Sequence, residues 1–83
     1  MSMDYRRPFP NRLKVIRQST GYTQRQVAKL LGFKTPSLLS DWENEKSMPN
    51  ATNLIKLCIL YNKASRDLYP EYYQQVARRF NEL

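Results

Sequence analysis

The sequence contains no histidine, one cysteine and only two glycines among its 83 residues. The lone cysteine, Cys58, cannot form a disulfide bond within the chain, and a zinc site made of cysteine and histidine ligands is excluded. The absence of histidine also removes the side chain that most often carries general acid–base catalysis. We therefore expect a protein that is not an enzyme and that needs no metal or other cofactor.

Long hydrophobic runs are missing as well. The apolar stretch from Leu54 to Tyr61 is interrupted by Lys56 and is far shorter than the ~20 residues of a membrane-spanning helix. We therefore expect no membrane partner, and the sparse cysteine content is typical of the cytoplasm. The scarcity of glycine argues against a sheet-rich or loop-rich architecture and favours an all-α fold.

Acidic residues are few compared with basic ones. Seven Asp and Glu stand against 14 Lys and Arg, which gives a formal net charge of +7. Such an excess on a small body favours a polyanionic partner, either nucleic acid or an anionic membrane, although solubility alone is the alternative interpretation. A chain of this length builds one compact core and has little room for a deep substrate pocket.

Capping residues and helix breakers divide the chain into about five expected helices. Asn11 is the expected N-cap of the first helix, and Gly21 ends it. Thr23 and Gln26 have the spacing of a capping box at the start of the second helix. Gly32 ends that helix, so both the first and the second helix are short.

Three further helices are expected along the rest of the chain. The third begins behind Thr35, with Pro36 in its first turn, and runs to about Glu43. Asn50 is the expected N-cap of the fourth helix, whose apolar residues recur at helical spacing. Ser65 or Asp67 could open one further turn, and a fifth helical stretch, rich in tyrosine, is expected beyond Pro70.

The second and third expected helices are separated by a glycine and a few residues, as in a helix-turn-helix. This motif needs a small residue where the two helices cross, and Ala28 has that place. The most compact turn would bury Leu38 and Asp41, but an unpaired carboxylate in the core is costly. A turn longer by one residue buries Leu39 and Trp42 instead, so we expect the longer turn.

Residues 11–68 resemble the phage repressor/Cro-like helix-turn-helix family. The strings that carry the resemblance are LKVIR, GYTQRQVAKLLG, SLLSDWEN and PNATNLIKL, in this order. The resemblance implies a lambda-repressor-like bundle that binds double-stranded DNA sequence-specifically, with the third helix in the major groove, and regulates transcription as a repressor. The chain then divides into a flexible arm over 1–10, a DNA-binding domain over 11–68 and a C-terminal helical extension over 69–83.

The resemblance also implies roles for individual residues. The expected base-reading positions are Thr35, Pro36, Ser37 and Asp41. The expected phosphate contacts are Gln24, Lys34, Asn44 and Lys46. Arg17 and Glu43 match an ion pair that ties the first helix to the end of the third. Arg6 and Arg7 could reach from the arm into a minor groove, and a merely solvated arm is the alternative.

The chain departs from the family pattern near the third helix. Glu45 stands where the family usually has glycine, so the turn after this helix could differ. Pro36 and Asp41 replace the more usual glutamines and arginines, and the third helix contains no basic residue. These departures keep open an alternative function, a protein-binding module such as an antitoxin-type partner subunit with secondary DNA contact.

The fourth helix is apolar on more than one side, because Ile55 and Ile59 lie off its main stripe. The tyrosine-rich segment after Pro70 could cover this second face within one chain, or between two chains as a dimer interface. We expect a homodimer on DNA, because a two-fold dimer reads two half-sites whereas one small domain reads few base pairs.

Overall fold

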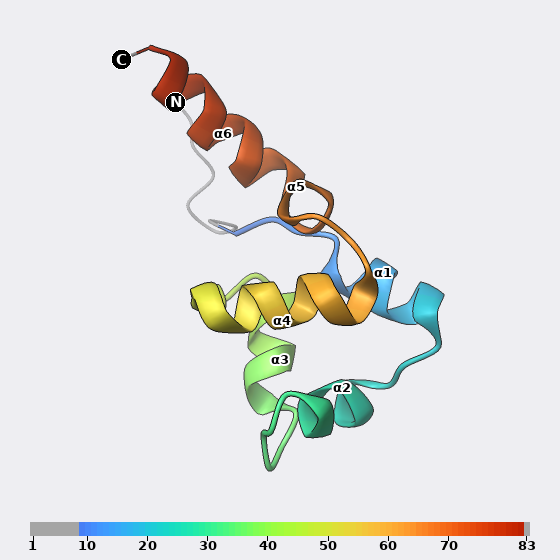
Figure 1. Cartoon of the computed structure of the whole chain (residues 1–83). Helices are drawn as coiled ribbons and strands as arrows, with labels where there is room; N and C mark the ends of the chain where they lie inside the picture. Colours follow the sequence, from blue (N-terminus) through green and yellow to red (C-terminus); the bar gives the residue numbers. More distant parts are fainter. Residues whose placement is uncertain (1–8, 83) are drawn as a thin grey trace.

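The computed structural model describes residues 9–82, and this part of the chain contains six helices and no strand (Figure 1). The helices are α1 (Leu13–Thr20), α2 (Gln24–Leu30), α3 (Ser37–Glu43), α4 (Ala51–Tyr61), α5 (Ser65–Leu68) and α6 (Pro70–Asn81). The all-α fold expected from the sequence is confirmed. The short α5 begins at Ser65, one of the two residues expected to open a further turn. Within the described residues, no helix is both long and apolar enough to span a membrane.

The predicted caps are present at the starts of α2 and α4. Thr23 Oγ1 accepts a hydrogen bond from the backbone N–H of Gln26 at 3.0 Å, and Gln26 Oε1 accepts one from the N–H of Thr23 at 2.8 Å. Asn50 Oδ1 accepts from the N–H of Asn53 at 2.8 Å. These bonds satisfy backbone donors that a helix leaves free at its first turn.

Two helix starts differ by a residue from the expectation. At α1, Arg12 has the N-cap position, and Asn11 caps from one residue earlier because its Oδ1 accepts from the N–H of Leu13 at 2.9 Å. At α3, Pro36 has the N-cap position and the helix begins at Ser37. Proline has no hydroxyl with which to cap, and the Thr35 hydroxyl instead accepts from the N–H of Ser37 at 3.4 Å.

The core lies between α1, α2, α3, α4 and α5 and is built from the inward residues of each. Its fully buried large side chains are Trp42, Tyr69, Leu13, Leu39, Leu57, Leu68 and Val27. The rings of Phe33 and Trp42 meet edge to face, with centroids 5.9 Å apart. Phe9 is half-buried and packs against this core, although the sequence assigns it to the arm. The core therefore draws on residues from Phe9 to Tyr69.

Helix α6 differs from the other helices in its packing. It packs against α5 and extends away from the rest of the molecule (Figure 1). Of its twelve described residues, none is buried. Ile55 and Ile59 on α4 stay 58% and 75% exposed, so of the two alternatives the one in which the C-terminal segment covers them within one chain is wrong. The helix starts at Pro70 and points outward, and this direction takes its apolar stripe away from α4.

Candidate nucleic-acid interface

Helices α2 and α3 pack against each other and are joined through a left-handed residue, Gly32. Ala28, the small residue predicted for the crossing of the two helices, is buried on α2. Helix α2 ends in a Schellman motif, in which the N–H of Phe33 donates to the carbonyl of Ala28 at 2.8 Å and the N–H of Gly32 to that of Lys29 at 3.0 Å. Gly32 has φ +89°, a backbone conformation that glycine adopts without steric cost. The motif directs the chain from α2 into α3.

The inner face of α3 consists of Leu39 and Trp42, which are both fully buried. Leu38 is 41% exposed and Asp41 is half-buried on the other side of the helix. The predicted register with the longer turn is therefore confirmed. Because Leu39 and Trp42 are packed in the core, the outer side chains of α3 have defined positions.

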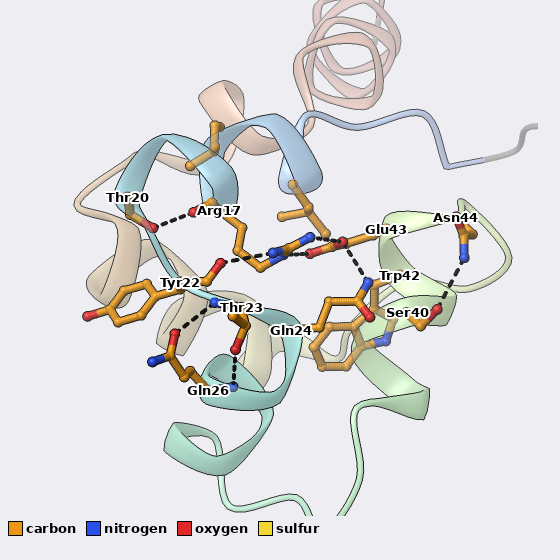
Figure 2. Close-up of polar contacts among 12 residues, drawn as sticks. Arg17, Thr20, Tyr22, Thr23, Gln24, Gln26, Ser40, Trp42, Glu43 and Asn44 are labelled. Carbon is orange, nitrogen blue, oxygen red and sulfur yellow. Dashed lines mark hydrogen bonds and ion pairs between the residues drawn. The ribbon is translucent and has the colours of Figure 1, made fainter.

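A buried ion pair holds the C-terminal end of α3 against α1 (Figure 2). Arg17 Nε donates to Glu43 Oε2 at 2.7 Å, and a second guanidinium nitrogen donates to Glu43 Oε1 at 3.2 Å. The side chains are 10% and 1% exposed. The hydrogen bond to Glu43 raises the pKa of Arg17 above its ordinary value. Arg17 also donates to the carbonyl of Tyr22 at 2.9 Å, so the pair ties three segments together.

Gln24 takes part in the same network. Its Nε2 donates to Glu43 Oε1 at 2.9 Å, and the side chain is half-buried between α2 and α3 (Figure 2). The sequence predicts that this amide contacts a phosphate. In the structure, its nitrogen donates a hydrogen bond to the Glu43 carboxylate within the protein. Gln24 therefore links the start of α2 to the end of α3.

Helix α3 also ends in a Schellman motif, with Glu45 in the left-handed position at φ +64°. The N–H of Lys46 donates to the carbonyl of Asp41 at 2.9 Å, and the N–H of Glu45 to that of Trp42 at 3.1 Å. The turn therefore has the backbone conformation that glycine favours, although a glutamate is present. Asn11 supports it, since its Nδ2 donates to the Trp42 carbonyl at 2.8 Å.

The predicted DNA contacts lie around the outer side of α3. Thr35 and Ser37 are exposed, while Pro36 and Asp41 are half-buried. The predicted phosphate contacts Lys34, Asn44 and Lys46 are all exposed, in the turns before and after α3. Asn44 donates from its amide to Ser40 Oγ at 3.2 Å. The structure thus brings these residues to the two ends and the outer face of one short helix. Arg6 and Arg7 lie outside the described residues.

Two further residues are exposed in this region, and the sequence interpretation did not single them out as candidates. Leu38 is exposed on α3, and Arg25 is exposed in the first turn of α2, beside Gln24. The register argument already contained the signal for Leu38, because a helix that buries Leu39 and Trp42 turns Leu38 outward. Nothing in the local sequence singles out Arg25 among the other basic residues.

Comparison with known proteins agrees with this architecture. The sequence model of the helix-turn-helix family matches residues 13–68, which include all of α1 to α5. The chain belongs to the helix-turn-helix family. The resemblance seen in the sequence is thereby confirmed, and within this family α2 and α3 are the two helices of the motif.

A solved structure supports the assignment independently. The helix-turn-helix chain is similar to a candidate DNA-binding protein from Bacteroides fragilis, with 33% sequence identity and a TM-score of 0.63. The match covers 70% of this chain and 92% of the other. None of the curated proteins compared with the chain matches it.

Proposed function

We propose that this helix-turn-helix protein binds double-stranded DNA sequence-specifically, places α3 in the major groove and regulates transcription as a repressor. The observation that carries the proposal is how α3 is held. Leu39 and Trp42 anchor its inner face, the Arg17–Glu43 pair anchors its end, and polar side chains remain on its outer face. Family membership and the similarity to a candidate DNA-binding protein support the same function.

Electrostatic attraction comes from residues beside α3, since the helix has no basic residue of its own. Lys34 and Lys46 are exposed in the turns before and after it, and Arg25 is exposed on α2. Phosphate contacts of this kind position a protein on the duplex without reading its sequence. Reading is left to the outer face, where Ser37 and Asp41 offer polar groups and Leu38 offers an apolar contact suited to a thymine methyl group.

The experiment is a titration of a fluorescent duplex pool at several salt concentrations. About six phosphate contacts per dimer predict a slope of about −5 for log K against log salt. Selection from a random DNA pool then reveals whether one site is preferred. Absence of binding even at low salt would overturn the proposal. Tight binding without any preferred site would contradict sequence-specific recognition and leave only non-specific DNA binding.

We also propose that the protein binds DNA as a homodimer through α6. Tyr73, Val76 and Phe80 lie at helical spacing on α6, and all three are exposed. An isolated helix of this length is marginal in water, so a partner helix would stabilise it. A two-fold pair of domains would also place two α3 helices about 34 Å apart, one turn of DNA.

Truncation tests the dimer, provided that the core is left intact. Leu68 and Tyr69 are buried, so the chain must end after them, for example at Glu71. Sedimentation of the full and truncated chains on a selected site should give two copies and one copy per site, respectively. A truncated chain that still binds as a pair would contradict the role of α6.

The alternative function, a protein-binding module of the antitoxin type, is favoured by the exposed apolar side chains of α4 and α6. Ile59 and Phe80 are the most exposed of these, at 75% and 71%. Substituting both with Ser should leave binding to a short half-site duplex unchanged if α3 alone reads DNA. If the protein binds no duplex at all, the partner-binding function explains the structure better than DNA binding does.

A further inference from the structure

A second group of basic side chains belongs to the region where α1 begins and α5 leads into α6. They surround an open pocket of about 330 Å³. Its lining residues are Arg12, Ile16, Lys63, Arg66, Asp67 and Pro70. They come from four places in the chain: α1 with its N-cap, the connection between α4 and α5, α5 itself, and the first residue of α6.

Backbone hydrogen bonds fix the walls of this pocket relative to one another. The N–H of Arg12 donates to the carbonyl of Leu68 at 2.9 Å, which joins the start of α1 to the end of α5. Leu68 is fully buried in the core. The connection before α5 is also held, because the N–H of Ala64 donates to Asp67 Oδ2 at 2.9 Å. The pocket is therefore part of the folded body and not a gap between loose segments.

The charge around the pocket is predominantly positive. Arg12, Lys63 and Arg66 contribute three cations, and Asp67 is the acid among the described lining residues. One carboxylate oxygen of Asp67 already accepts the Ala64 hydrogen bond. All three side chains are exposed, and a bound anion would accept hydrogen bonds from them and be attracted by their charges.

The pocket also has an apolar side. Ile16 is a core residue, and Pro70 presents a ring without a backbone donor. Pockets of a few hundred Å³ with an apolar wall and a few convergent polar groups are typical of small-molecule sites. A bare inorganic anion would use the charges and leave the accessible part of this wall, chiefly the half-buried Pro70, in contact with water.

We propose that this pocket binds a small organic anion, a phosphate monoester or carboxylate that carries an apolar ring or chain. The anionic group contacts Arg12, Lys63 and Arg66, and the apolar group packs on Ile16 and Pro70. Because Pro70 is the first residue of α6, the ligand binds at the joint between the body and α6, away from the outer face of α3.

The test is an NMR titration of the ¹⁵N-labelled full chain with phenyl phosphate. We expect saturable shifts of backbone amides near residues 12–16 and 63–69. Inorganic phosphate and phenol, which each carry half of the ligand, should bind about tenfold more weakly. Shifts confined to Gln24, Lys34 and Lys46 would mean that phosphate binds on the α3 side, and shifts that do not saturate would mean non-specific attraction; either result overturns the proposal.

Matched substitutions of exposed basic residues complete the test. Arg66→Gln should weaken phenyl phosphate binding about tenfold, because it removes a charged hydrogen-bond donor. Lys56→Gln changes the net charge equally on α4, outside the pocket, and should have no such effect. Equal effects of the two variants would reduce the site to general electrostatic attraction. The titration contains no DNA, so its outcome is independent of whether the protein binds duplex.

Discussion

Helices α3 and α6 are both amphipathic, but they use their apolar side chains in opposite ways. Leu39 and Trp42 of α3 are fully buried in the core. The apolar stripe of the longer helix α6 is exposed, and Phe80 at its end is 71% exposed. The end of α3 is also held by the ion pair between Glu43 and Arg17 of α1. Helix α6 packs against α5 and otherwise extends into solvent (Figure 1).

The difference separates the two tasks of a small DNA-binding domain. A short helix whose inner face is packed and whose end is bonded presents its outer side chains at defined positions, as sequence reading requires. A helix with an open apolar stripe presents surface that a second chain can cover. The stability of the fold should therefore depend on the inner face of α3, and assembly should depend on α6.

The largest expected effect tests this division directly. Leu39→Ala should lower the free energy of unfolding by about 4 kcal/mol, because it removes a fully buried side chain and leaves a cavity. Phe80→Ala, at an exposed position, should change it by less than about 0.5 kcal/mol when the chain is dilute. Urea denaturation followed by circular dichroism measures both. A comparable loss in Phe80→Ala at low concentration would show that α6 is packed onto the body.

The second expected effect concerns the anchor at the end of α3. Arg17→Met should cost about 3 kcal/mol, because it leaves the Glu43 carboxylate buried without its cation. Combining it with Glu43→Gln in a double-mutant cycle should recover part of that loss. If the two losses add strictly, the side chains do not meet in solution, and α3 is held by its apolar face alone.

Much of this arrangement follows from local rules that the sequence obeys. The capping box of Thr23 and Gln26 depends only on residues three apart, and it forms as predicted. The register of α3 follows from the cost of burying a carboxylate, which selects Leu39 and Trp42 over Leu38 and Asp41. Local propensity and side-chain polarity therefore determine both helices of the motif.

Features that depend on distance in three dimensions could not be predicted in this way. Gln24 bonds Glu43 across 19 residues, and Asn11 bonds the carbonyl of Trp42 across 31. The direction of α6 depends on the backbone at Tyr69, whose φ and ψ of −132° and 66° belong to no regular element. Periodicity along α6 indicates which face is apolar, but not what that face meets.

The third prediction separates the residues around α3 that recognise bases from those that attract the phosphate backbone. Asp41→Ala should relax discrimination at one base pair by about 2 kcal/mol, because a carboxylate in the major groove can accept from the N4 amine of cytosine. Binding to random DNA should hold or improve, since a charge that phosphates repel is removed. Parallel binding selections on wild-type and variant protein measure the preference at each position.

Lys46→Ala is the matched comparison for Asp41→Ala. It should weaken binding to all sequences alike and make the salt slope shallower by about one unit. If Asp41→Ala selects the same site with the same stringency, this carboxylate is only solvated, and the reading face of α3 lies elsewhere.

The smallest expected effect concerns the turn that follows α3. Glu45 has φ +64°, and a side chain in this left-handed region costs roughly 1 kcal/mol that glycine does not. Gly32 occupies the equivalent place after α2 at φ +89°. The carboxylate of Glu45 also makes interactions, among them a 3.4 Å contact from the N–H of Asn11, so Glu45→Gly removes strain and contacts together.

Glu45→Ala separates the two contributions, because it removes the same carboxylate and keeps the Cβ atom. Glu45→Gly should therefore be more stable than Glu45→Ala by about 1 kcal/mol in urea denaturation, even though glycine makes the unfolded chain more flexible. Both variants should bind DNA more tightly than wild type by the same factor, since each removes one negative charge close to Lys46. An alanine variant as stable as the glycine variant would mean that this turn is not left-handed in solution, and that α3 ends in a different way from α2.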